Sequence, residues 1–105
     1  MKLLTVTREN LPQAVEVALA ECLLQLDAAK KCANSWLERD LNSALYALRL
    51  IDSELRNPTT ARPKHLRSAA FIRYVIDEEP NMMMNEECKQ FVVRIEDIYK
   101  RYDVK

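Results

Sequence analysis

The chain of 105 residues contains no glycine, although an average composition would supply about seven in a hundred residues. Glycine is the usual residue in tight hairpin turns, in phosphate-cradling loops and at the left-handed ends of helices. Its absence argues against a fold of β-hairpins, a P-loop and a dinucleotide-binding fingerprint. The composition that remains, with 49% hydrophobic residues, predicts a folded and strongly helical chain.

An excess of charge and the residue types of catalytic motifs are also missing. Sixteen basic and sixteen acidic residues give a net charge of zero, so there is no overall attraction to nucleic acid or an anionic membrane. The single histidine is His65, and no C-x-x-C or H-E-x-x-H motif occurs. A Cys88–His65 nucleophile would need a tertiary proximity that the sequence does not show. We therefore expect no catalytic residue, no cofactor and no metal site.

The cysteines are Cys22, Cys32 and Cys88. An odd number without secretory features predicts reduced thiols and a cytoplasmic protein. All three fall in helical patterns, where a buried cysteine acts as a small hydrophobic residue. The apolar run in residues 1–6 is too short for a signal peptide, and no run of 18 apolar residues predicts a membrane span.

Two apolar stripes with spacings of three and four residues run between Pro12 and Pro58, which is typical of amphipathic helices. They consist of Val15, Ala18, Cys22, Leu26, Ala29 and Ala33, and of Leu37, Leu41, Ala44, Leu48, Ile51 and Leu55. Ser35 and Glu38 form a capping-box pattern that predicts a new helix at Ser35. Asn34 can close the preceding helix in the left-handed conformation. The alternative is one long helix over residues 12–56.

The other boundaries follow from prolines and capping residues. Asn10 and Gln13 resemble a capping box at the start of the first helix, with Pro12 in its first turn. A third helix is predicted from residues 60–63 to Glu78, where Pro80 ends it. Asn85 is the predicted N-cap of a last helix. The apolar stripe of that helix is Cys88, Phe91, Val92, Ile95, Ile98, Tyr99 and Tyr102.

Four helices with short connections predict an all-α, up-down antiparallel four-helix bundle. The predicted domain is single and spans residues 1–105, with residues 1–9 as an N-terminal arm. The alternative fold packs a long helix over residues 12–56 against a C-terminal helical hairpin. Trp36, at the start of the second helix, is interpreted as a packing anchor.

The predicted third helix is the candidate binding element, because apolar residues cover most of its circumference. A partner protein or a second copy of the chain would cover the apolar residues that the bundle itself does not bury, unless the N-terminal arm covers them. Basic residues precede its apolar part, and the methionines of the following loop can adapt to irregular surfaces. The candidate partner-binding residues are Arg62, Lys64, Arg67, Phe71, Arg73, Tyr74, Met82, Met83 and Met84.

The sequence therefore predicts a small non-enzymatic helical protein that binds another protein, as an inhibitor, immunity protein, chaperone or adaptor. Its size and predicted architecture are similar to those of small immunity proteins, secretion chaperones and phage-encoded inhibitors, a similarity of shape alone. The alternative is a nucleic-acid-associated regulator that uses the basic segment 62–73. Acidic residues 77–79 with Glu86 and Glu87 form a further charged patch, which would suit a basic partner. The alternative for this patch and for the basic segment is that their side chains are solvated or paired with neighbouring helices.

Overall fold

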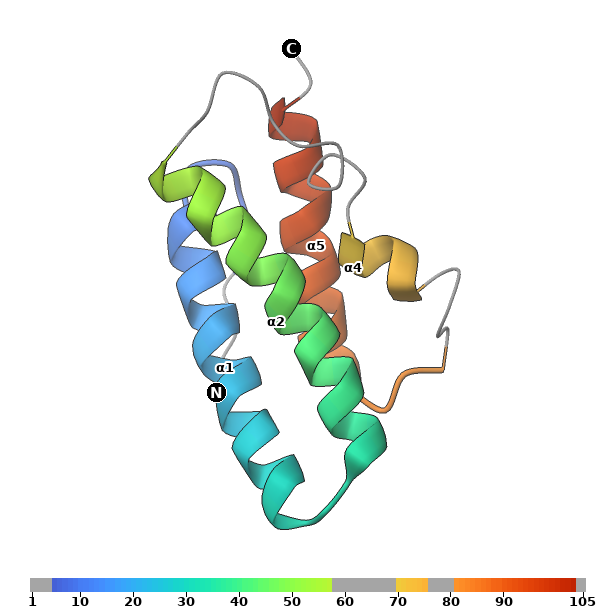
Figure 1. The fold of residues 1–105 in the computed structure, drawn as a ribbon. Helices are drawn as coiled ribbons and strands as arrows, with labels where there is room; N and C mark the ends of the chain where they lie inside the picture. The colour runs from blue at the N-terminus through green and yellow to red at the C-terminus, as the bar shows by residue number, and fades with distance from the viewer. Residues whose placement is uncertain (1–4, 58–69, 76–80, 104–105) are drawn as a thin grey trace.

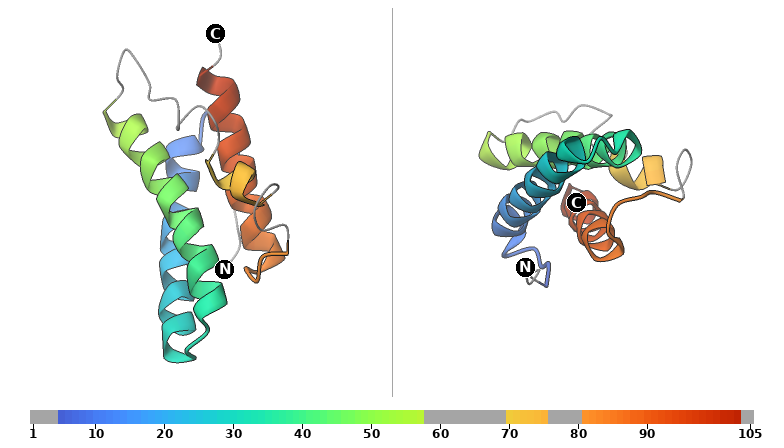
Figure 2. Two further views of the ribbon diagram at one scale, coloured as in Figure 1. Left: turned by 45° about the vertical axis from the view of Figure 1, so that its right-hand side comes forward. Right: turned by 90° about the horizontal axis from the view of Figure 1, so that it is seen from below.

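The computed structural model describes residues 5–57, 70–75 and 81–103. All regular structure in these ranges is helical: α1 (Leu11–Lys31), α2 (Ser35–Arg56), α4 (Ala70–Arg73) and α5 (Glu86–Asp103). Helices α1 and α2 form an antiparallel hairpin, and α5 packs against both, while the short α4 contacts α5 and α2 (Figures 1 and 2). Seen from below, α5 lies in the angle between α1 and α2 (Figure 2, right).

The core forms where the three predicted stripes meet. The buried side chains of the described residues include Val15, Ala18, Cys22, Leu26 and Ala29 from α1, Leu41, Ala44, Leu48 and Ile51 from α2, and Cys88, Phe91, Val92, Ile95, Ile98 and Tyr99 from α5. Val6, which precedes α1, is also buried in this core. The helical spacing of three and four residues therefore identified the packed faces of all three long helices.

The break between α1 and α2 is confirmed, so the single long helix over residues 12–56 is wrong. Ala33 has a φ of 53°. Its N–H donates to the carbonyl of Lys30, and the N–H of Asn34 donates to the carbonyl of Ala29. This pair of bonds is a Schellman motif, which normally has glycine in the left-handed position. In this chain without glycine, Ala33 takes that position instead of the predicted Asn34.

The N-cap of α2 is Asn34 and not Ser35. The Oδ1 of Asn34 accepts a hydrogen bond of 3.1 Å from the N–H of Leu37. Ser35 is the first helical residue, so the predicted Ser35–Glu38 capping box does not form. Because Asn34 leaves the left-handed position to Ala33, its side chain is free to cap the next helix.

Replacing Asn34 with alanine is expected to lower the free energy of unfolding by about 0.5–2 kcal/mol, because the N–H of Leu37 loses its acceptor. Ser35→Ala is the matched control and should change the free energy of unfolding by less than about 0.5 kcal/mol. Chemical denaturation followed by circular dichroism measures both. A larger effect at Ser35 than at Asn34 would contradict this assignment.

Replacing Ala33 with glycine is expected to raise the free energy of unfolding by about 1 kcal/mol, since glycine adopts positive φ without the steric cost of a Cβ atom. The control is Ala28→Gly, at an exposed position inside α1, where the same change should cost about 0.5–1 kcal/mol. Opposite signs in urea unfolding would establish the strain at Ala33. Destabilisation by both variants would refute it.

The capping box predicted at the start of α1 is also wrong in detail. Asn10 is the N-cap residue, but its side chain makes no capping bond to α1. Its Oδ1 accepts from the N–H of Thr7, and its Nδ2 donates to the carbonyl of Thr5. Asn10 therefore orders the residues before the helix, which places Val6 in the core. The cap predicted for α5 is confirmed, because the Oδ1 of Asn85 accepts from the N–H of Cys88.

A four-helix bundle is not confirmed. Within the described residues, the predicted third helix is limited to the four residues of α4 and a π-type turn at Tyr74 and Val75. The N–H groups of Phe71 and Ile72 donate to Glu96. The rest of the predicted helix lies outside the described residues.

Candidate functional site

The exposed side of α2 carries the largest solvent-facing aromatic side chains of the described residues. Trp36 is 59% exposed and Tyr46 is 57% exposed. The interpretation of Trp36 as a packing anchor is therefore wrong. Its neighbour one turn later, Arg39, stacks over the indole with its guanidinium carbon 4.6 Å from the ring centroid. Spacings of three and seven residues place Trp36, Arg39 and Tyr46 on one side of the helix.

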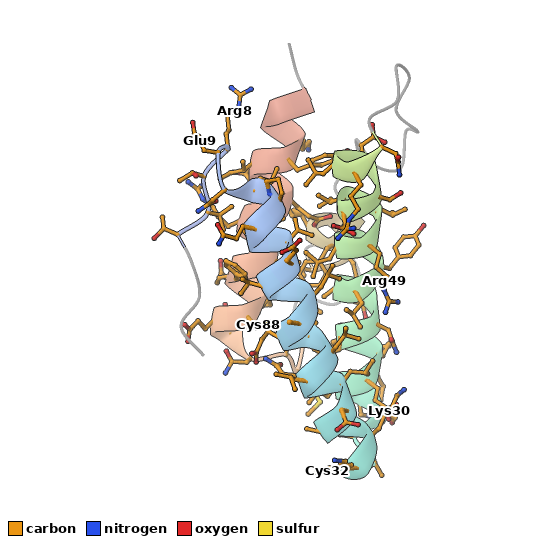
Figure 3. All side chains as sticks on the ribbon, turned by 90° about the vertical axis from the view of Figure 1, so that its left-hand side faces the viewer. Arg8, Glu9, Lys30, Cys32, Arg49 and Cys88 are labelled. Atoms are coloured by element: carbon orange, nitrogen blue, oxygen red, sulfur yellow. The ribbon has the colours of Figure 1, made fainter. Side chains whose placement is uncertain are left out.

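The largely exposed charges of α2 have one sign, whereas its acidic residues Glu38 and Asp52 are half-buried. The charged residues of α2 with largely exposed side chains are Arg39, Arg49 and Arg56. Arg56 is paired with Asp52 of the same helix at 3.1 Å, and Arg49 projects outward from α2 (Figure 3). We call Trp36, Arg39, Tyr46 and Arg49 the α2 face. It combines aromatic and cationic groups, and no exposed acidic residue of α2 accompanies them.

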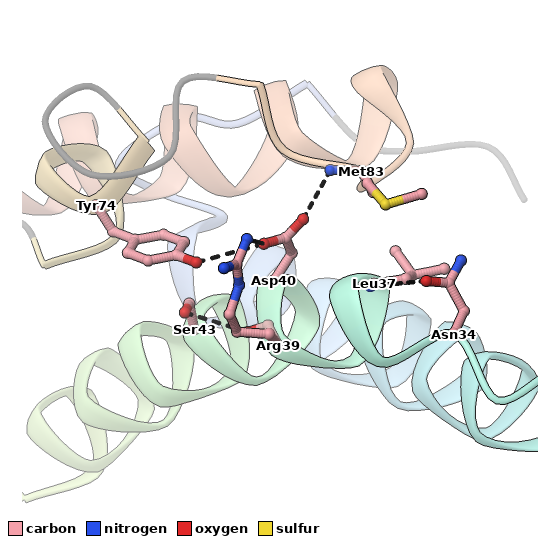
Figure 4. A network of polar contacts seen from close by, with 7 residues as sticks. All are labelled: Asn34, Leu37, Arg39, Asp40, Ser43, Tyr74 and Met83. Atoms are coloured by element: carbon pink, nitrogen blue, oxygen red, sulfur yellow. Dashed lines mark hydrogen bonds and ion pairs between the residues drawn. The ribbon is translucent and has the colours of Figure 1, made fainter.

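Met83 lies beside the α2 face and is 55% exposed. Its backbone N–H donates a 2.7 Å hydrogen bond to the Oδ2 of Asp40, which is on α2 (Figure 4). The side chains of Met82 and Met84 are buried. The three methionines therefore divide their roles: two anchor the loop in the core, and the middle one projects into solvent.

Asp40 is the centre of the polar network that holds this region together (Figure 4). Its side chain has no solvent exposure. Besides the N–H of Met83, the hydroxyl of Tyr74 donates to Oδ1 over 3.3 Å, and Arg39 pairs with the same oxygen at 3.3 Å. The carboxylate thus joins α2 to the segment after α4 and to the 81–85 loop. It also fixes the guanidinium that stacks on Trp36.

Glu96 makes the corresponding link from α5. Its buried carboxylate accepts the N–H of Phe71 at 2.9 Å and that of Ile72 at 2.6 Å. These are the second and third residues of α4, whose N–H groups a helix cap normally binds. Burial raises the pKa of Glu96 to about 7, against the lowering effect of the two N–H bonds and of Lys100.

The predicted partner-binding residues fall into several environments. Phe71 is 1% exposed and belongs to the core, and Tyr74 is half-buried with its hydroxyl on Asp40. Arg73 is the last residue of α4, and its side chain is not among those that the structure describes. Arg62, Lys64 and Arg67 also lie outside the described residues, as do His65 and residues 77–79 of the acidic patch. Of the described candidates, only Met83 presents a largely exposed side chain.

The fold places the three cysteines in two different environments. Cys22 and Cys88 are buried, as expected, but Cys32 caps the C-terminus of α1 and is exposed. Its predicted place within a helix is therefore wrong, because α1 ends one residue earlier. The sulfur atoms of Cys22 and Cys88 lie 3.9 Å apart. Sequence spacing gave no sign of this pairing between α1 and α5.

The residues missed by sequence reasoning carried weak signals. Asp40 directly precedes the core residue Leu41, and Glu96 directly follows the core residue Ile95. An acidic residue at the edge of an apolar stripe is usually solvated, so neither position suggested a buried carboxylate. The exposed aromatic Tyr46 lies opposite the core stripe of α2, and this position was the available clue to the α2 face.

Comparison with known families, curated proteins and solved structures gives no match for this chain. Across the described residues, no group of three or more His, Cys, Asp or Glu side chains is placed to hold a metal ion. None of the described helices has the combination of length and apolarity needed to span a bilayer.

Proposed function

We propose that this is a non-enzymatic helical protein that binds another protein, in the manner of an inhibitor, immunity protein, chaperone or adaptor, through the α2 face. The observation that carries the proposal is the exposure of Trp36 and Tyr46 alongside arginines on one side of α2. Tryptophan, tyrosine and arginine are the residues most enriched in binding hot spots.

The chemistry of the partner follows from the charge of the surface. Arg39 and Arg49 each follow one of the aromatic residues by one helical turn, and the exposed charged residues of α2 are all arginines. A complementary surface would supply carboxylates around an apolar patch that accepts the indole and the phenol. Met83 adds an adaptable apolar contact beside this face. The proposed partner is therefore a protein with an acidic, partly apolar surface.

The α2 face is pre-organised for binding. Arg39 is held by Asp40 and stacks on Trp36, so neither side chain has to be ordered from a free state when a partner arrives. Asp40 also holds the backbone of Met83. Restricting these groups beforehand reduces the entropy that association loses. The buried carboxylate thus supports the proposed surface without contacting the partner.

The test uses the protein partner captured from an extract of the native host. Trp36→Ala and Arg49→Glu should each raise the Kd for that partner about tenfold or more, because tryptophan and arginine side chains dominate binding at hot spots. Leu24→Ala and Lys30→Glu are matched controls, since both residues are exposed on α1 and should leave the Kd unchanged. Calorimetry measures binding, and circular dichroism verifies the fold. Equal affinities for wild type, Trp36→Ala and Arg49→Glu would refute the α2 face.

A second copy of the chain is one form that this partner can take, and sedimentation identifies it. If the captured protein is the chain itself, the same substitutions should shift the monomer–dimer equilibrium towards monomer. A monomer at high concentration excludes the homodimer. The odd number of cysteines supports a reducing, cytoplasmic setting for the proposed interaction.

A nucleic-acid partner is the second candidate, because aromatic rings interleaved with arginines also bind single strands. The net charge of zero counts against it. Fluorescence titration of Trp36 with a single-stranded oligonucleotide separates the two classes. Quenching that weakens steeply with added salt would support nucleic acid, whereas no quenching would leave the protein partner as the proposal.

A further inference from the structure

We propose that Cys22 and Cys88 form an oxidation site, at which hydrogen peroxide converts the two thiols into an intramolecular disulfide that joins α1 to α5. The two residues are 66 positions apart in the chain and their sulfur atoms are 3.9 Å apart. Cys88 lies where α5 passes α1, and Cys32 lies at the turn between α1 and α2 (Figure 3). The inference does not depend on the proposed binding function.

The geometry requires little movement. A disulfide has a sulfur–sulfur distance of about 2.05 Å, so the two sulfurs must approach by roughly 2 Å from their present separation. Both side chains come from helices that pack directly against each other. We therefore expect rotation of the two side chains with a small displacement of the helices, and no unfolding of either helix, to close the gap between the sulfurs.

Cys88 is the better placed of the two to react first. It is the third residue of α5, which begins at Glu86, and a helix N-terminus stabilises a thiolate. The hydrogen bond between the two sulfur atoms lowers the pKa of Cys88. The pKa of Cys22 is raised by this hydrogen bond and by burial. When the pair loses one proton, the negative charge therefore lies on the sulfur of Cys88.

The chemistry balances with one peroxide molecule. The Cys88 thiolate attacks a peroxide oxygen, the O–O bond breaks, and the departing hydroxide leaves as water after taking a proton, so that Cys88 becomes a sulfenic acid. Cys22 then attacks the sulfenic sulfur. The S–O bond breaks, and hydroxide leaves as water with the proton from Cys22. Two thiols and one hydrogen peroxide give one disulfide and two waters.

Burial makes the site selective for small oxidants. Cys22 is 0% exposed and Cys88 is 2% exposed, so a bulky disulfide reagent cannot reach either sulfur in the folded protein. Hydrogen peroxide is close to water in size and can enter through small fluctuations of the packing. Cys32 is exposed and should react with both kinds of reagent. The chain thus contains its own internal control thiol.

The experiment treats the folded Cys32→Ser variant with hydrogen peroxide, blocks remaining thiols under denaturing conditions, and analyses tryptic peptides by mass spectrometry. Cys22 and Cys88 lie on the separate tryptic peptides 9–30 and 74–89. We expect a linked pair of these peptides, two hydrogen atoms lighter than their sum. The linked protein should unfold at a Tm about 10 °C higher, and a reductant should reverse the shift.

Two further measurements test whether the reaction is confined to the buried pair. In the wild-type protein, 5,5′-dithiobis(2-nitrobenzoate) should label Cys32 alone until the fold is denatured. Cys88→Ser should abolish the linked peptides. If peroxide leaves Cys22 and Cys88 open to alkylation after denaturation, or takes Cys88 to a sulfinic acid without a link to Cys22, the proposed oxidation site is wrong.

Discussion

Asp40→Ala is expected to lower the free energy of unfolding by about 3–5 kcal/mol, the range seen when one partner of a buried charged network is removed. The side chain is fully buried, and the variant would leave the N–H of Met83 without its 2.7 Å acceptor. The hydroxyl of Tyr74 would also lose its contact with Oδ1. An unpaired buried donor costs more than the hydrogen bond contributed.

Two graded variants test the origin of this effect. Tyr74→Phe removes one donor over 3.3 Å from a half-buried residue, and should cost about 1 kcal/mol. Asp40→Asn keeps the shape and one acceptor oxygen, so its cost should lie between those of Tyr74→Phe and Asp40→Ala. Urea unfolding at pH 7 gives all three values. A cost below about 1 kcal/mol for Asp40→Ala would show that the network does not hold the loop.

Glu96 is expected to make the protein less stable as the pH rises from about 4.5 to about 7. The pKa of its carboxyl is raised from the ordinary value of 4.5 to about 7 in the folded state, because burial disfavours the charged form. The folded state therefore binds more protons than the unfolded state between these values. The stabilisation is fully present below pH 4.5 and is lost by pH 7, a change on the order of 3 kcal/mol.

Glu96→Gln separates this contribution from the other titrating groups. The difference in unfolding free energy between the variant and the wild type should move in favour of glutamine as the pH rises through this range, and then level off. Glu86→Gln is the matched control on the same helix, because the pKa of the exposed Glu86 is lowered by hydrogen bonds from Gln90 and Lys89. A pH-independent difference for Glu96→Gln would contradict the raised pKa.

The helices were predictable because local signals determine them. Spacings of three and four residues marked the core faces of α1, α2 and α5, and the chain break near Ser35 was located within one residue. The roles within that break were not predictable, because Asn34 suits both the left-handed position and the N-cap, and nothing local marks Ala33 as the residue that adopts positive φ. The absence of glycine showed only that some other residue must adopt positive φ. It did not indicate which residue does so.

The site was much less predictable than the helices. The buried state of Asp40 and Glu96 depends on N–H groups from residues that are 24 to 43 positions away, and no local pattern encodes such partners. The apolar character of Phe71 was correctly noted, but the core of this chain covers it, so apolarity alone did not identify a binding surface. Trp36 shows the converse, since a large apolar side chain was assumed to be buried and is exposed.

The buried carboxylates of Asp40 and Glu96 also have a consequence for motion. Together they bind the backbone N–H groups of Phe71, Ile72 and Met83. Exchange of these three amide hydrogens with solvent therefore requires α4 and the 81–85 loop to separate from side chains of α5 and α2. Local opening at these amides would report on tertiary contacts while the α1–α2 hairpin stays closed.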